Sequence, residues 1–248
     1  DLIKTKRRKM ILKDGIKILL IGLFIWVDSI GFAQFYSEGT IYYTRRTNLQ
    51  KRFTDQRMKR FVTEDNKIKN DRFSLAFNDT ISVFKYLPPA TADEMAWLTS
   101  KNEYYQYLNP NKQLTIFQFF GTSVYVKDSL PVRSWKITDS KRTICGFNCR
   151  KAIYEKNDST RIYAWYAPNI LPSIGPEGFC GLPGTILGIA TEDGGIIYFA
   201  DKVDFSVGPK PEVLGVEIGK NKLFTLKELR EKLEKDYGNT PWGKRMFD

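Results

Sequence analysis

The chemistry open to this sequence is limited first by an absence, because the chain contains no histidine. Histidine is the commonest general base and transition-metal ligand, so imidazole-dependent triads are excluded. An enzyme would have to use carboxylates, for instance Asp158, Glu177, Glu192 or Asp193. A pair about 5–10 Å apart would support a glycosidase-like hydrolase, although Glu192-Asp193 before Gly194 first predicts a turn. We therefore predict no catalytic residue and keep a carboxylate-dependent hydrolase as an alternative.

Three cysteines, Cys145, Cys149 and Cys180, are the other reactive side chains. In an oxidising compartment two of them would pair, and we expect Cys180 to join Cys149, with Cys145 as the alternative. The spacing of Cys145 and Cys149 resembles half of a metal site. Without histidine or a fourth cysteine, four-ligand zinc binding would need carboxylates. We predict no metal site and no cofactor.

A glycine-rich stretch, residues 175–189, contains five glycines and two prolines before an apolar, β-branched run. Glycine permits positive φ and proline fixes φ, so the stretch predicts a shaped turn that leads into a strand at 185–190. It lacks the Lys-Ser/Thr of a phosphate-binding loop and a following helix. We interpret it as a structural corner. The alternative is direct contact with a ligand or partner, through Gly175, Pro176, Gly181, Leu182, Pro183 and Gly184.

The N-terminal residues 1–34 predict a secretory signal peptide. Seven basic residues precede or open an apolar run at 16–27, and a polar, small-residue zone follows at 28–34. A transmembrane anchor is the alternative, but the run is shorter than the roughly 20 residues that a bilayer span needs. Met10 is an alternative start, which would make residues 1–9 an upstream extension. We therefore expect an exported protein, not transmembrane after cleavage.

Residues 35–248 predict a single, mainly β domain. Alternating apolar and polar residues, separated by turn residues, predict many short strands; the expected strands are 37–46, 73–77, 81–86, 104–108, 114–126 (one or two), 132–137, 143–155, 160–166, 186–190, 196–200 and 202–207. One helix is predicted after Thr225, where Glu228 completes a capping box. The expected fold is a single curved antiparallel sheet or half-open barrel with a C-terminal helix.

Charge points to anionic partners. Beyond residue 34 the chain has thirty-two basic and twenty-five acidic residues, a net charge of +7. Residues 47–71 are strongly basic and predict a loop or short surface helix. This segment is either a solvated connector or a contact site for an anionic partner, such as lipid headgroups or acidic polysaccharide. Nucleic acid is not expected as a partner, because export separates the protein from it.

Several sequence blocks resemble the GLPGLI family of exported Bacteroidetes proteins. The blocks are Trp135-Lys136-Ile137, residues 144–152 (Ile-Cys-Gly-Phe-Asn-Cys-Arg-Lys-Ala), residues 164–170 (Ala-Trp-Tyr-Ala-Pro-Asn-Ile), and Gly175-Pro176 with residues 181–187 (Gly-Leu-Pro-Gly-Thr-Ile-Leu). Thr185 stands where the family name has Leu. The resemblance implies a β-rich domain in the periplasm or at the outer-membrane periphery, and it carries over no catalytic residues.

The expected function is a binding or envelope-accessory module. A concave apolar sheet face would hold an outer-membrane protein, a peptide or a lipid. One alternative is the carboxylate-dependent hydrolase. The other is a structural envelope-assembly component that docks through the basic residues of 51–69.

Overall fold

The computed structural model describes residues 34–53, 55–119, 121–157 and 160–238. The chain divides into two units, residues 1–34 and 35–248. The predicted signal peptide and the upstream extension 1–9 lie outside the described residues, apart from Gln34. The second unit carries the fold and is described by itself.

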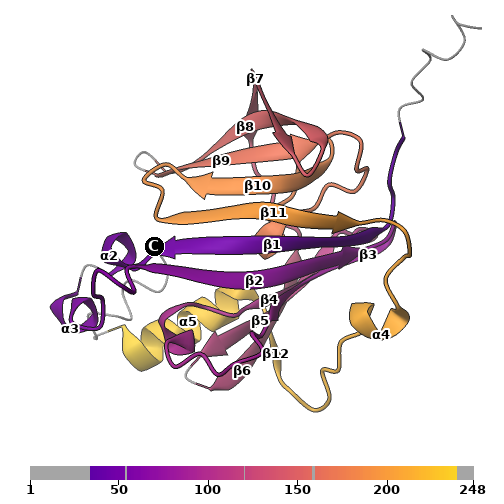
Figure 1. Ribbon diagram of the computed structural model, residues 1–248. Helices are drawn as coiled ribbons and strands as arrows, with labels where there is room; N and C mark the ends of the chain where they lie inside the picture. The colour runs from indigo at the N-terminus through magenta and orange to yellow at the C-terminus, as the bar shows by residue number, and fades with distance from the viewer. Residues whose placement is uncertain (1–33, 54, 120, 158–159, 239–248) are drawn as a thin grey trace, which may run out of the picture. The chain divides into compact units, whose positions relative to one another are not determined.

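One open sheet dominates this unit (Figure 1). Its order is β12-β6-β5-β4-β3-β2-β1-β11-β10-β9-β8-β7, and only the β12–β6 pair is parallel among the described strands. The strands are β1 (Gly39–Asn48), β2 (Ile68–Phe77), β3 (Ile81–Leu87), β4 (Glu103–Tyr107), β5 (Lys112–Phe119), β6 (Thr122–Ser129), β7 (Trp135–Ile144), β8 (Phe147–Asn157), β9 (Thr160–Ala167), β10 (Thr185–Thr191), β11 (Ile196–Asp204) and β12 (Leu223–Phe224). The prediction of a mainly β fold with one open sheet is confirmed.

The helices are short except at the C-terminal end. They are α2 (Leu49–Arg52), α3 (Gln56–Lys59), η1 (Ala96–Leu98), η2 (Pro176–Gly178), α4 (Pro211–Leu214) and α5 (Leu226–Tyr237). The predicted capping box of α5 is present, because the Thr225 side chain accepts from the Glu228 N–H and the Glu228 carboxylate accepts from the Thr225 N–H. None of the described helices has the length and apolarity to cross a membrane.

The structure revises the bounds of several predicted strands. The predicted strand 143–155 is divided at Gly146 between β7 and β8, and the predicted strands 196–200 and 202–207 belong to the single strand β11. Residues 114–126 form β5 and β6, because Gly121 adopts a φ of 82° that closes a hairpin. The predicted strand at 132–137 begins later and runs further, as β7, and its pairing with β8 shifts register between Ile137 and Lys141. Such a bulge keeps a long edge strand paired while bending it.

The sheet wraps around the segment between β9 and β10, residues 168–184. The carbonyl oxygen of Gly178 in this segment accepts from Gln106 Nε2 of β4 at 3.0 Å and from Arg133 Nη1, just before β7, at 3.3 Å. Seven strands separate β4 from β7 in the sheet order. Both ends of that arc therefore reach one loop, which requires a strongly curved sheet.

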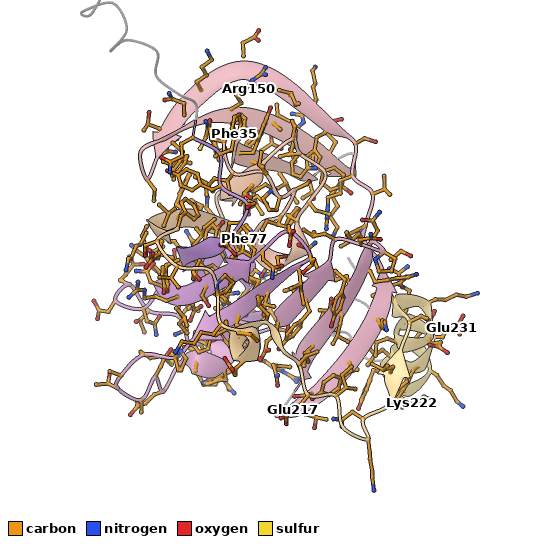
Figure 2. All side chains as sticks on the ribbon, turned by 90° about the vertical axis from the view of Figure 1, so that its right-hand side faces the viewer. Phe35, Phe77, Arg150, Glu217, Lys222 and Glu231 are labelled. Carbon is orange, nitrogen blue, oxygen red and sulfur yellow. The ribbon has the colours of Figure 1, made fainter. Side chains whose placement is uncertain are left out.

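The core fills the curve of the sheet. Inward residues of β1, β2 and β8–β11 form one apolar cluster, and Ile170, Ile174 and Leu182 of the wrapped segment are buried in it. Figure 2 shows Phe77 deep among these side chains, whereas Arg150, Glu217 and Glu231 lie at the surface. The apolar face expected to hold a ligand is thus filled here by the chain's own side chains.

Candidate functional site

The glycine-rich stretch is largely inside the molecule. Gly175, Pro176, Leu182 and Gly184 are buried, while Gly181 and Pro183 are exposed. Gly184 has a φ of 137°, and a Cβ there would lie 2.3 Å from the Ala167 carbonyl oxygen. Only glycine fits such a close backbone approach at positive φ. Four of the six residues singled out from the sequence therefore pack within the corner, and two reach its surface.

Hydrogen bonds fix the corner to the start of β10. The Thr185 N–H donates to the Ile170 carbonyl at 2.9 Å, and the Thr185 hydroxyl donates to the Pro172 carbonyl at 2.7 Å. The Trp135 indole N–H donates to the Cys180 carbonyl at 2.9 Å. The Thr185 that departs from the GLPGLI pattern thus has a buried bonding role of its own.

Glu177 leaves this corner and meets a row of polar side chains on the inner face of the sheet. In the strand register Arg45 of β1 pairs with Asp71 of β2 on one side and with Tyr198 of β11 on the other. The Arg45 guanidinium donates to Asp71 Oδ2 at 2.7 Å and to the Tyr198 hydroxyl at 3.2 Å. The Tyr198 hydroxyl donates in turn to Glu177 Oε1 at 2.6 Å.

The charges in this row are tightly balanced. The side chains of Arg45 and Asp71 are only 4% and 1% exposed. Burial opposes the charge of Arg45, but Tyr198, Asp71 and Glu177 outweigh it and raise its pKa. Burial likewise opposes the charge of Asp71, yet hydrogen bonds from Lys101 and Arg45 lower its pKa below the usual value. Buried charges persist only when paired in this way.

Two features of the row depart from ordinary packing. Glu177 has a φ of 50°, which is uncommon for a residue other than glycine, and its side chain is 28% exposed. Burial lowers the pKa of Lys101 to about 8, although its hydrogen bond to Asp71 opposes this. Backbone strain and a lysine with a shifted pKa are typical of functional sites. A structural ion-pair network accounts for both features as well.

The cysteines are free thiols in the structure, so the expected Cys149–Cys180 pair, and the alternative with Cys145, are absent from it. Each sulfur has a different neighbour. Cys149 Sγ contacts the Phe147 carbonyl, Cys145 Sγ contacts the Ala200 carbonyl, and Cys180 Sγ contacts the Pro131 carbonyl. Burial raises the pKa of Cys149 to about 12. A buried thiol of this kind is unreactive.

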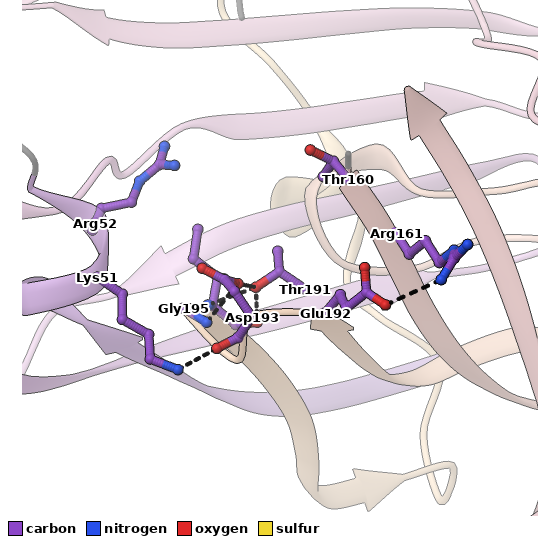
Figure 3. A pocket seen from close by; sticks show the side chains of 9 residues that line it. Lys51, Arg52, Thr160, Arg161, Thr191, Glu192, Asp193 and Gly195 are labelled. Carbon is purple, nitrogen blue, oxygen red and sulfur yellow. Dashed lines mark hydrogen bonds and ion pairs between the residues drawn. The ribbon is translucent and has the colours of Figure 1, made fainter. Parts of the chain in front are cut away.

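A polar cleft of about 400 Å³ lies where the β10–β11 turn meets α2 (Figure 3). The cap of α2 positions it, because Asn48 Oδ1 accepts from the Lys51 N–H and the Asn48 N–H donates to the Gly195 carbonyl at 2.8 Å. Figure 3 shows Lys51 and Arg52 on one side of the turn and Arg161 on the other. The cleft therefore carries three cations.

The two carboxylates in the cleft are already engaged. Glu192 Oε1 accepts from Arg161 Nη1 at 3.3 Å and from the Tyr163 hydroxyl at 3.0 Å. Asp193 Oδ1 accepts from the Thr191 hydroxyl at 2.6 Å and from the Gly195 N–H at 2.9 Å, and the Thr191 bond is the main cause of its lowered pKa. Asp193 is thus a turn-forming residue.

Among the residues that the structure describes, neither Lys51 nor Arg52 forms an ion pair with a carboxylate. The Lys51 ammonium donates to the backbone carbonyl of Asp193. The exposed guanidinium of Arg52 forms no hydrogen bond or ion pair with any described residue, and it points away from the other side chains in Figure 3. The described lining of the cleft thus has three basic and two acidic side chains, a net charge of +1.

Of the four carboxylates named from the sequence, the cleft brings together Glu192 and Asp193, Glu177 lies in the inner row, and Asp158 is outside the described residues. The sequence reasoning missed Arg45 and Asp71. Both had a readable signal, because each lies in phase with the buried residues of its strand, Arg45 with Ile41 and Tyr43, and Asp71 with Phe73. Among the described residues no cluster of metal-binding side chains is present.

Known proteins give this chain a fold and a family match but no activity. A family model described as "Protein of unknown function (Porph_ging)" matches residues 154–188, from β8 through the glycine-rich corner. No curated protein matches the sequence. Two structures of PNGF-II, in the C2 and P21 space groups, are similar over 79% of this chain, with TM-scores of 0.53 and 0.54 and identities of 16% and 15%. This chain spans 32% of the PNGF-II chain in each. At such identities the likeness is one of fold alone, and the match over residues 154–188 is to a family model whose function is unknown.

Proposed function

We propose that this chain is an exported binding or accessory module of the cell envelope, working in the periplasm or at the outer-membrane periphery, and that it belongs to the GLPGLI family. The leader-like composition of residues 1–34 supports export. The sequence blocks between 133 and 190 support the family. Neither feature identifies a ligand.

We propose that the ligand is the anionic headgroup of a lipid, bound at the cleft of Figure 3. The main support for this proposal is the Arg52 guanidinium, which lines the cleft beside Lys51 and has no partner among the described residues. An arginine offers five donors in a fork that matches a phosphate. Two further exposed basic residues, Arg57 and Lys59 of α3, follow closely in the chain.

Two observations favour a headgroup over an apolar cargo. The curve of the sheet is filled by Ile170, Ile174 and Leu182, so a lipid tail would have to displace core side chains. The cleft, by contrast, is polar and open at the surface. Electrostatic attachment to an anionic surface needs only exposed basic residues, each contributing about 1 kcal/mol.

The hydrolase alternative has less support. A glycosidase-type pair needs one carboxyl group with a raised pKa to act as the acid. Every Asp or Glu among the described residues whose pKa clearly departs from its usual value has it lowered. Glu192 and Asp193 are held by Arg161 and by the turn, respectively.

The test is fractionation of cells that produce the wild-type chain, the Arg52→Glu variant and a matched control, Lys220→Glu, which reverses an exposed charge remote in sequence from the cleft. We expect the wild type and the control outside the cytoplasm and partly with membranes, from which salt releases them. Arg52→Glu should move to the soluble exported fraction. Cytoplasmic wild type would contradict export, and an unchanged distribution of Arg52→Glu would contradict headgroup binding at the cleft.

A further inference from the structure

A second pocket, of about 460 Å³, lies beside the start of α2 and the loop that follows β3. Its apolar wall is formed by Leu49, Ile68, Pro89, Met95 and Leu98. Leu49 and Leu98 are almost fully buried, so this wall belongs to the folded core and is fixed in place. The pocket is therefore an open surface hollow with a preformed apolar wall and a polar remainder.

The polar side chains of the pocket differ in whether they have a hydrogen-bond or ion-pair partner. Asp93 Oδ2 accepts from the Lys69 ammonium, and Asp93 Oδ1 accepts from the Met95 N–H at 3.0 Å. Lys69 is also 3.8 Å from Asp71 Oδ1 and is almost buried, so its charge is directed inward. Asp65, by contrast, is exposed and forms no hydrogen bond or ion pair with any described residue.

The pocket thus offers a carboxylate that has no partner among the described residues, in a unit whose net charge is positive. Two carboxylates and one lysine line it, and the lysine is already shared between Asp93 and Asp71. The unmet charge is negative. A ligand that complements both walls must be apolar along its length and cationic at its end.

An exposed aromatic pair adjoins the pocket. Phe61 and Trp97 are 39% and 55% exposed, with ring centroids 5.2 Å apart at an interplanar angle of 90°. Trp97 lies between the lining residues Met95 and Leu98, and the Phe61 carbonyl accepts from Asn66 Nδ2 of the lining at 2.8 Å. Tryptophan left at the surface beside a pocket is typical of a binding hot spot.

We propose that this pocket binds a lysine side chain of an extended peptide, with the ammonium at Asp65, the methylene stem against Met95 and Leu98, and the neighbouring peptide groups against the Phe61–Trp97 pair. A lysine side chain has the required form, because its stem packs on apolar surface while its head stays with a charge. Peptide side chains that enter pockets in this way give specificity to an extended ligand. The inference is independent of the headgroup cleft, which is lined by other residues.

The test is calorimetric titration with a short peptide that has one central lysine and polar flanks, against the same peptide with norleucine or glutamate in its place. We expect the lysine peptide to bind at least about tenfold more tightly than either, a difference of about 1.4 kcal/mol. Asp65→Asn should remove that preference. The change is at an exposed side chain, so the fold should persist, and circular dichroism checks it.

Two controls separate the site from general charge. Glu64→Gln removes the neighbouring carboxylate, which pairs with Lys67 and does not line the pocket, and should leave binding unchanged. Arg52→Glu should also leave it unchanged. Quenching of Trp97 fluorescence by the bound peptide, lost in Trp97→Phe, would support the position of the ligand. Equal binding of the three peptides, or equal losses in Asp65→Asn and Glu64→Gln, would overturn the proposal.

Discussion

The Arg45 guanidinium donates to the Asp71 carboxylate at 2.7 Å across two neighbouring strands, and both side chains are buried. Because β1 lies in the middle of the sheet, this ion pair is placed where the wrapped segment closes over the inner face, and Glu177 of that segment lies 3.6 Å from the same guanidinium. The pair therefore links the sheet to the glycine-rich corner.

Removing one partner of this pair should destabilise the chain strongly. Arg45→Met removes the guanidinium from Asp71 and leaves this carboxylate with Lys101, Lys69 and the Thr99 hydroxyl, and Asp71→Asn leaves the guanidinium short of its charged acceptor on β2. Breaking a buried pair in this way costs about 3–5 kcal/mol. Urea denaturation should show that loss for each single variant and less than the sum for the double variant. Single losses below about 1 kcal/mol would contradict a buried structural pair.

Lys101 should make stability rise with pH. Burial lowers its pKa from 10.5 to about 8 in the native state. Between these values the unfolded chain binds more protons at this residue than the native chain does, so the free energy of unfolding increases as pH rises. We expect urea denaturation at a series of pH values to show this effect. The free energy of unfolding of the wild type should rise relative to that of Lys101→Met from about pH 8 upward. A difference independent of pH would show that Lys101 titrates as an ordinary lysine.

Gly184→Ala should disrupt the corner far more than an alanine at an open glycine. The new Cβ would lie 2.3 Å from a backbone oxygen, whereas Gly219, which also has positive φ, has no atom within 4 Å of such a Cβ. Overpacking costs about 1–3 kcal/mol, and the backbone conformation adds about 1–3 kcal/mol. Thermal denaturation should therefore show a large loss of stability for Gly184→Ala. Gly219→Ala should lose only the stability that the backbone conformation costs. Equal losses would contradict the close packing of the corner.

The three cysteines should react as free thiols once the chain is unfolded. In the native state Cys149 should resist alkylation, because burial raises its pKa to about 12 and thiolate is the reactive form. Iodoacetamide added after unfolding without reductant should modify all three cysteines, as read by intact mass. A single modified cysteine would instead indicate the Cys149–Cys180 or Cys145–Cys180 disulfide that an oxidising compartment favours.

Local patterns predicted the elements well. Alternation in 37–46 and 160–166 corresponds to β1 and β9, and the Thr225–Glu228 capping box marks the start of α5. These features depend on neighbouring residues only. Short turns predicted antiparallel strands in one mainly β domain, and the many glycine bends predicted a curved sheet; the structure confirms one open sheet.

Long-range pairing could not be predicted in the same way. Nothing in 37–46 indicates that β1 lies between β2 and β11, and this pairing is what brings Arg45, Asp71 and Tyr198 into one row. The extent of β7 was also missed, because its bulge interrupts the alternation between Ile137 and Lys141. Lys51 and Arg161 are far apart in the sequence, and they line one cleft because the β10–β11 turn lies between them.

The most direct test of headgroup binding is co-sedimentation of the purified chain with vesicles that contain an anionic phospholipid, compared with vesicles of zwitterionic phosphatidylcholine alone. We predict binding to the anionic vesicles only, weakening with salt, and at least about tenfold weaker for Arg52→Glu, since charge reversal removes about 2 kcal/mol of attraction. Lys220→Glu should bind nearly as the wild type does. Binding to neither vesicle, or equal binding by Arg52→Glu and Lys220→Glu, would contradict the proposed function.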